Sequence, residues 1–250
     1  MDGPRGRRLG DRGRVEGSRR VPRSRCGARL LRRLRRDRPV RRRGGRLGVC
    51  GLSTLDKFGA AIAAIDEANA ADPGMVDVRD AGPRPLALVH GELADEWVVR
   101  LHGAEVSPLW RLAARAHHLR RWELSRSNYP EGKAGYHRWK RDQRARHAAD
   151  IGTLLAAHGF GDDEIELVQA LVRRDGLAGG DPGAQAVEDA ACLVFIETQL
   201  ASVAQQLERD HLIDVIRKTA RKMSPAALAA VASIPLGDAE QQLLADALSA

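Results

Sequence analysis

Apolar residues recur at intervals of three or four positions along most of the chain beyond residue 52. In the first two such stretches they are Leu55, Phe58, Ile62 and Ile65, followed by Leu93, Trp97 and Leu101. This interval places apolar side chains on one face of an α-helix, whereas a half-buried strand would alternate apolar and polar residues. Because no convincing alternation and no internal repeat occurs, the pattern predicts an all-α protein with a single domain over residues 52–250.

Capping residues, prolines and glycines mark where we expect the helices to begin and end. Ser107 followed by Pro108 is typical of a helix start, because serine caps the helix and proline fits its first position. Gly159 should end the longest helix. The predicted helices cover about 53–72, 85–102, 108–122, 136–158, 162–172, 184–207 and 210–223, and two short ones begin at 224 and 238. The unbroken apolar run at 193–196 predicts that the 184–207 helix is the buried central one.

The formal net charge of +8 hides a sharp division of charge along the chain. Residues 1–48 contain 19 arginines, no lysine and four acidic residues. The other 202 residues carry 22 of the 41 basic and 29 of the 33 acidic side chains. The expected folded part is therefore mildly acidic, and its overall charge gives no reason to expect a large nucleic-acid interface.

The arginine-rich segment has two interpretations. It can be a basic arm that binds nucleic acid or acidic lipid. It can also be upstream sequence translated from a start codon assigned too early, with the true start at Val49 or Leu52, and this is the interpretation we favour. In either case residues 1–51 lack apolar periodicity, and we expect them to be a disordered or wrongly assigned N-terminal extension.

Cysteine usage and hydropathy predict a cytoplasmic protein. The three cysteines are scattered and form neither a CxxC pair nor a disulfide framework. No apolar run approaches the roughly 18 residues of a membrane span, and the start lacks the apolar segment of a secretory signal. We therefore expect no membrane partner.

The stretch LAARAHHLRRW, which ends at Trp122, is the most unusual pattern in the chain. A lone histidine in a helix is usually a surface residue, but His118 follows small apolar residues that suit an interior. On a continuous helix Arg115 and Trp122 would share its face, whereas His117 would point about 100° away as a bystander. Arg115 and Arg121 are poor core residues, but they suit a cleft that binds an anion.

A second histidine lies late in the long predicted helix. Lys140, Arg144 and His147 fall three or four residues apart, so they form one basic stripe that ends in a histidine. Such a stripe is usually a solvated helix face. Asp150 lies three residues beyond His147, where it could bind the same ion or orient the imidazole.

Two acidic residues, Glu188 and Asp189, directly precede ACLVFIE, the most hydrophobic run of the chain. Buried carboxylates cost several kcal/mol unless they are paired or bound to metal. The alternative is that they belong to the first turn of a helix, where the helix dipole favours acids. Two histidines and a carboxylate from three helices suit zinc, iron or manganese, so we expect His118, His147 and Asp189 to bind a divalent metal.

Several separate motifs of the chain occur together in one known family. They are Ile65-Asp66…Asn69…Asp72-Pro73, AARAHHLRRW, Arg126…Tyr129-Pro130, Tyr136…Trp139-Lys140, His147, and Gln185-Ala186-Val187-Glu188-Asp189…Cys192-Leu193-Val194-Phe195. By these motifs the stretch from about Phe58 to Ser224 resembles a bacterial and fungal family described as domain of unknown function 4202. That name implies no activity.

The order of elements also resembles that of HD-type metal-dependent phosphohydrolases. In that superfamily an early helix carries a ligand histidine, here His118. A later histidine, here His147, opens a helix that ends in glycine, and an acidic pair, here Glu188-Asp189, precedes a hydrophobic helix. The resemblance implies an HD-like helical bundle with a metal site. The sequence departs from the superfamily because the paired His-Asp is absent between His118 and His147, where Tyr129-Pro130 and Tyr136-His137 stand instead.

Three functions fit these features. The first is hydrolysis of a phosphate ester, of a small molecule or nucleotide, in which a metal-bound water attacks phosphorus and Glu188 or Asp150 orients or deprotonates that water. The expected substrate-binding residues are Arg115, Arg121, Trp122, Tyr129, Lys140 and Arg144. The second is a non-catalytic HD-like module that binds an anionic ligand, which the missing His-Asp pair favours. The third is RNA-related binding or processing, with bases stacked on the aromatic side chains.

Overall fold

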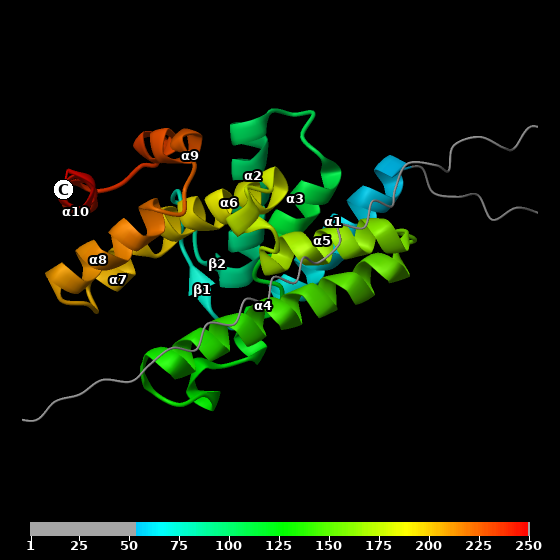
Figure 1. Cartoon of the computed structure of the whole chain (residues 1–250), viewed down its shortest axis with the longest axis horizontal. Helices are drawn as coiled ribbons and strands as arrows, with labels where there is room; N and C mark the ends of the chain where they lie inside the picture. Colours follow the sequence, from blue (N-terminus) through cyan, green and yellow to red (C-terminus); the bar gives the residue numbers. More distant parts are fainter. Residues whose placement is uncertain (1–53, 250) are drawn as a thin grey trace, which may run out of the picture. The chain divides into compact units, whose positions relative to one another are not determined.

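A computed structural model of the protein describes residues 54–249. The expectation for residues 1–51 lies outside the described residues. The predicted all-α fold is confirmed (Figure 1). The longer helices are α1 (Thr54–Ala70), α2 (Leu86–His102), α3 (Pro108–Arg115), α4 (Gly132–Ala157), α5 (Asp162–Arg173), α6 (Pro182–Thr198), α8 (Arg209–Ala220) and α10 (Asp238–Leu248). Shorter helical segments are η1 (Arg121–Glu123), η2 (Arg126–Asn128), η3 (Leu177–Gly179), α7 (Leu200–Ala204), α9 (Pro225–Ala230) and η4 (Val231–Ser233).

One small piece of β-structure was not expected. The strands β1 (Met75–Val76) and β2 (Arg84–Pro85) pair antiparallel and close the loop between α1 and α2. Asp72 stabilises the same junction, because one carboxylate oxygen accepts from the backbone N–H of Gly74 and the other from that of Ala87. The proline-rich loop is therefore held tightly against the start of α2.

The prediction of one helix over 108–122 is wrong. Helix α3 begins at Pro108, after Ser107, but it ends at Arg115, and residues 116–120 form a tight turn in which Arg120 is left-handed with φ of 50°. Tertiary hydrogen bonds compete with the helix here. Asn69 of α1 accepts from the backbone N–H of Arg120 at 3.0 Å, and Gln143 of α4 donates to the carbonyl of Arg121 at 2.9 Å. Trp122 consequently does not share a helical face with Arg115 and His118.

Helix α6 is buried along most of its length, as the apolar run predicted, but its expected extent needs correction. It begins at Pro182, because Asp181 caps it by accepting from the backbone N–H of Ala184 at 2.7 Å. It ends at Thr198, where Gln199 leaves helical geometry before the short helix α7. The helix expected over 184–207 is thus two helices joined at Gln199.

Two apolar clusters build the interior, and α6 contributes to both. The first cluster joins α1, α3, α4 and α5 to the start of α6, through residues such as Ile65, Leu112, Ile151 and Val168. The second joins α2 and the rest of α6 to α8, α9 and α10. Figure 1 shows α6 with α8, α9 and α10 on one side and α1, α3 and α5 on the other. Helices α2, α3, α4 and α6 therefore converge where the predicted site residues lie.

None of the helices within residues 54–249 is long and apolar enough to cross a membrane.

Candidate functional site

Four histidines meet where α2, the 116–120 turn and α4 come together. We call His90, His117, His118 and His147 the histidine cluster. The Nδ1 atoms of His90 and His118 are 3.0 Å apart. Ring centroids of His117 and His118 are separated by 4.0 Å, and those of His118 and His147 by 6.3 Å. The structure therefore brings His118 and His147 close together and adds two histidines to them.

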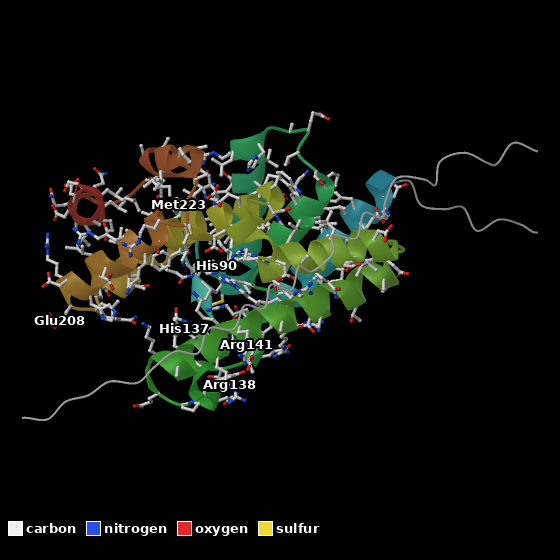
Figure 2. All side chains as sticks on the ribbon, viewed as in Figure 1. His90, His137, Arg138, Arg141, Glu208 and Met223 are labelled. Carbon is white, nitrogen blue, oxygen red and sulfur yellow. The ribbon has the colours of Figure 1, made fainter. Side chains whose placement is uncertain are left out.

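Sequence reasoning missed His90 and dismissed His117. His90 lies in the middle of the bundle (Figure 2), and its exposed fraction is only 1%. Its position three and seven residues before Leu93 and Trp97, on the apolar face of α2, is a signal that could have indicated its burial. The expectation that His117 points away from His118 is wrong, because it relied on a helix that continues past residue 115, whereas the turn buries this ring against His118.

Two rings of the cluster have a buried nitrogen without a hydrogen-bond partner. His117 donates its Nδ1–H to the carbonyl of Ala114 at 2.8 Å, and His147 donates its Nδ1–H to the carbonyl of Leu119 at 2.7 Å. These bonds place the hydrogen of each neutral ring on Nδ1, so each Nε2 carries no hydrogen and has a lone pair available for binding. Within the described residues neither Nε2 has a partner. Histidines that bind metal show this pattern, with one nitrogen held by a carbonyl and the other free.

Burial keeps the four imidazoles neutral. Desolvation, reinforced by the nearby Arg121, lowers the pKa of His90 to about 4 and that of His147 to about 3. Desolvation is also the main cause that lowers the pKa of His117 and His118 well below the usual value, and neighbouring rings and arginines add to it. Neutral imidazole is the form that binds a metal, so the cluster is in the required state at physiological pH.

The donor set of the cluster fits zinc, manganese or iron, because imidazole nitrogens are common ligands of these ions and two of them lack any other partner. The side chains do not form a ready-made cage. Within residues 54–249 no group of three histidine, cysteine, aspartate or glutamate side chains is arranged to hold an ion. Metal binding here would therefore require side-chain rotation in the cluster.

The acidic pair of α6 is buried, and protein groups already bind it. Glu188 accepts from Arg174 at 3.0 Å, and Arg144 and Lys222 lie 3.6 and 3.7 Å from its carboxylate. Desolvation alone would raise the pKa of Glu188, but the charges of Arg174 and Arg144 outweigh it and lower that pKa.

Asp189 stabilises the junction before α9. One oxygen of its carboxylate accepts from Gln185 and from the backbone N–H of Ser224, both at 2.8 Å. Because α6 begins at Pro182, neither Glu188 nor Asp189 belongs to its first turn, so the helix dipole does not explain them. Their hydrogen bonds give a structural explanation that needs no metal.

Two partly buried cations near the cluster form no ion pair with an acidic side chain among the described residues, although Glu188 still raises the pKa of one of them, Lys140. The guanidinium of Arg121 lies 4.8 Å from the centre of the Trp139 ring, and Lys140 lies 5.5 Å from that of Tyr136. Desolvation lowers the pKa of both side chains. Lys222, Arg144 and Arg121 all lower the pKa of Lys140 further, which means that several positive charges face one another here. An anionic ligand would relieve this repulsion.

The other expected ligand-binding residues have other surroundings. Arg115 forms a bidentate ion pair with Asp66, at 2.7 and 2.6 Å, so its guanidinium is engaged in linking α1 to α3. Tyr129 donates to Asp142 at 3.1 Å, and Trp122 is half-buried in η1. Asp150 keeps one buried carboxylate oxygen without a hydrogen bond, 3.6 Å from Arg146.

Comparison with known proteins gives one finding. The family model described as Domain of unknown function (DUF4202) matches residues 59–244. No curated protein and no solved structure matches the chain.

Proposed function

The chain belongs to the DUF4202 family, whose description assigns no activity, and on its geometry we propose that the protein is a metal-dependent hydrolase of a phosphate ester. One observation carries the proposal: His117 and His147 each present a buried, unpartnered Nε2 whose tautomer a backbone carbonyl fixes. A buried polar atom without a partner is rare in folded proteins and commonly indicates an ion or water that belongs there.

The proposed metal ligands are His117, His118 and His147. The first two follow one another in the 116–120 turn, and the third comes from α4. His117 replaces Asp189 in the expected set, since Asp189 already accepts two hydrogen bonds. A divalent ion held by these rings would supply Lewis acidity and a nucleophilic water at neutral pH.

The phosphate group would be bound by Arg121 and Lys140, with Arg144 beside them. Partly desolvated cations such as Arg121 and Lys140, which form no ion pair of their own, have the right charge and donors for phosphate oxygens, and a planar guanidinium binds such oxygens in pairs. The cation–π contact of Arg121 with the Trp139 ring limits where its guanidinium can lie. Donors restricted in this way stabilise developing negative charge on phosphorus with little reorganisation.

Positioning roles fall to the carboxylates. Asp150 has a buried oxygen that accepts no hydrogen bond and lies 3.6 Å from Arg146, one helical turn from His147 on α4, and we assign it the role of orienting the attacking water. Glu188, by contrast, is paired with Arg174, and we assign it the role of holding Arg144 toward the site.

The test is metal content together with hydrolysis of a panel of phosphate esters, measured on the wild type, His147→Ala and His137→Ala. His137 lies on the same helix but is exposed, so it is the matched control. We expect near-stoichiometric transition metal and turnover in the wild type and in His137→Ala, and loss of both in His147→Ala. A wild type that is metal-free and inactive in several preparations would overturn the proposal.

A second function has one observation in its favour. Since no three side chains within the described residues form a ready ion cage, the cations alone could bind an anionic ligand without turnover. In that case Arg121→Met would weaken binding of inorganic phosphate, while chelation and His147→Ala would leave it unchanged. Binding of RNA, competed by salt, would instead support the RNA-related alternative.

A further inference from the structure

His90 connects the end of α6 to the histidine cluster. Its Nδ1 lies 3.0 Å from Nδ1 of His118, and its Nε2 lies 3.0 Å from the hydroxyl oxygen of Thr198. Thr198 is the last residue of α6, so the break before α7 lies directly at this contact. The three side chains form a continuous hydrogen-bonded chain from the helix end to the cluster.

The single hydroxyl hydrogen of Thr198 determines which atoms donate and which accept in these hydrogen bonds. A threonine hydroxyl has a single hydrogen. That hydrogen is directed at the carbonyl of Val194, one turn earlier, at 2.7 Å. Toward His90 the hydroxyl oxygen can therefore only accept, which requires a hydrogen on Nε2 of His90. The structure places the amide nitrogen of Gln199 3.3 Å from the same nitrogen, so this state of His90 requires the opposite orientation of the amide, in which the amide oxygen accepts from Nε2.

The state of His118 follows from that of His90. A neutral imidazole carries one N–H, so Nδ1 of His90 is the acceptor in its contact with His118. His118 must then donate from Nδ1, which leaves its Nε2 as a bare lone pair. His117 and His147 reach the same state through their carbonyl acceptors, so three neighbouring rings have equivalent free Nε2 atoms.

We propose that Thr198 is a positioning residue for the cluster: through His90 it holds His118 in the tautomer whose Nε2 can bind an ion. The inference rests on the proposed function for its purpose, but not for its geometry. In many metal sites the ligand histidine donates its second N–H to a carboxylate or a carbonyl. Here the neutral hydroxyl of Thr198, acting through His90, has that role. His118 has no backbone acceptor of its own among the described residues, which explains why it needs this longer chain.

The experiment compares Thr198→Val, which removes the acceptor at nearly constant volume, with Thr198→Ser, which keeps the hydroxyl. Thr219→Val is the matched control, because Thr219 donates to the carbonyl one turn earlier, at 2.9 Å, and contacts no histidine that the structure describes. Long-range nitrogen-15 NMR of the metal-free full chain reports the tautomer of each histidine, and Co²⁺ titration reports affinity.

We expect His118 to carry its hydrogen on Nδ1 in the wild type, Thr198→Ser and Thr219→Val. In Thr198→Val this preference should disappear, and Co²⁺ should bind about tenfold to a hundredfold more weakly. A wild-type His118 protonated on Nε2 overturns the inference even if Thr198→Val fails to fold. If the tautomers are as expected but no variant binds Co²⁺, the positioning role stands and the proposed function fails.

Discussion

Two buried polar groups of this protein differ in what surrounds them. The acidic pair of α6 is the more conspicuous in sequence, yet Glu188 and Asp189 accept hydrogen bonds or ion pairs from neighbouring protein groups. The histidine cluster is less conspicuous, yet two of its nitrogens are buried with no partner among the described residues. Since folding normally satisfies buried polar atoms, the unsatisfied group is the better indicator of ligand binding.

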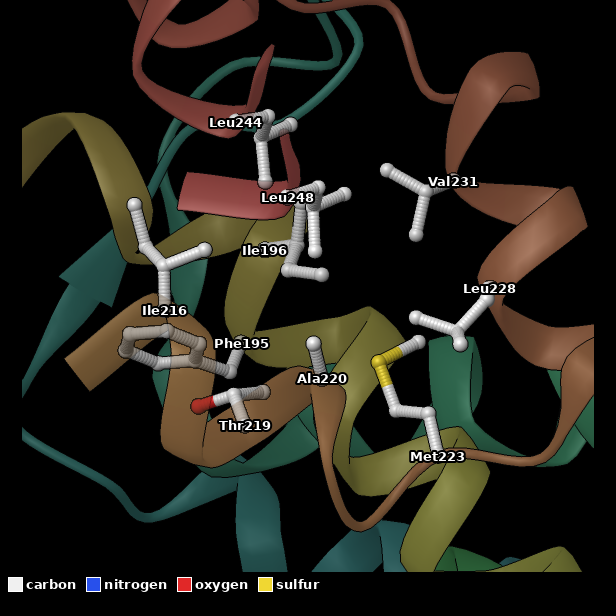
Figure 3. A pocket seen from close by; sticks show the side chains of 10 residues that line it. All are labelled: Phe195, Ile196, Ile216, Thr219, Ala220, Met223, Leu228, Val231, Leu244 and Leu248. Carbon is white, nitrogen blue, oxygen red and sulfur yellow. The ribbon is translucent and has the colours of Figure 1, made fainter. Parts of the chain in front are cut away.

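A cavity in the C-terminal part of the fold differs from the histidine cluster in the same way as the acidic pair does, because its polar side chain already has a hydrogen-bond partner. A small cavity there is lined by Phe195, Ile196, Ile216 and Met223, with Leu228, Val231 and Leu244 around them (Figure 3). The hydroxyl of Thr219, the polar side chain in the lining, already donates to the carbonyl of Val215. This cavity presents no unpaired polar atom, so it gives no indication of chemistry.

The largest expected effect is that of pH on the metal-free protein. His90 and His147 are neutral in the fold at pH values where the unfolded chain protonates them, so the unfolded state binds more protons as pH falls below about 6.5. With folded pKa values of about 4 and about 3, each ring should remove about 3 kcal/mol of stability between pH 6.5 and 4.

Urea unfolding at several pH values measures this effect. His147→Gln should flatten the fall in stability, and the exposed His137→Gln should not. A free energy of unfolding that is constant between pH 6.5 and 4.5 would show that the buried rings are not held neutral.

The second effect concerns the acidic pair. Glu188→Ala leaves Arg174, whose side chain is 6% exposed, as an unpaired buried charge, and we expect a loss of about 3–5 kcal/mol in the free energy of unfolding. Joint replacement of both residues by methionine should recover most of it. Asp214→Ala, which breaks an exposed ion pair on α8, should have no resolvable effect. If Glu188→Ala were equally harmless, the pair would not stabilise the fold as described.

The third effect, stabilisation by Zn²⁺, distinguishes the histidine cluster from the acidic pair as the metal site. Zn²⁺ at a hundredfold excess over its dissociation constant should stabilise the wild type by about 2.7 kcal/mol. Because the acidic pair is not a ligand in our account, the Asp189→Asn protein should still be stabilised by Zn²⁺, whereas the His117→Ala protein should not. Thermal unfolding with and without Zn²⁺ gives the answer, and the reverse result would restore Asp189 as a ligand.

The smallest effect is on anion binding. Arg121→Met should weaken binding of inorganic phosphate about tenfold, which corresponds to about 1.4 kcal/mol. Arg141→Met is the control, since Arg141 is 73% exposed and paired with Asp142. Calorimetric titration measures both, and equal affinities in the two variants would remove Arg121 from the site.

The sequence predicted the helices well because apolar spacing and caps are local signals. It predicted site roles for His118, His147, Arg121 and Lys140, and the structure brings these four side chains into one region. It could not predict the end of α3 at Arg115, because the competing hydrogen bonds come from Asn69 and Gln143, which are distant in sequence.

The error about α3 explains why His117 was expected to point away from His118. A continuous helix turns His117 away from the interior, whereas the tight turn buries it. In the same way, the partners of Glu188 come from three different parts of the chain, so no local pattern distinguishes a satisfied carboxylate from a ligand.

X-ray absorption spectroscopy of the Zn²⁺-loaded full chain tests the central claim most directly, because it counts the atoms bound to the ion. We predict three imidazole nitrogens at about 2.0–2.1 Å in the wild type, and no zinc retained by His147→Ala after the same loading. A first shell made only of oxygen, or a spectrum unchanged by His147→Ala, would contradict the claim that the unpartnered histidines form the site.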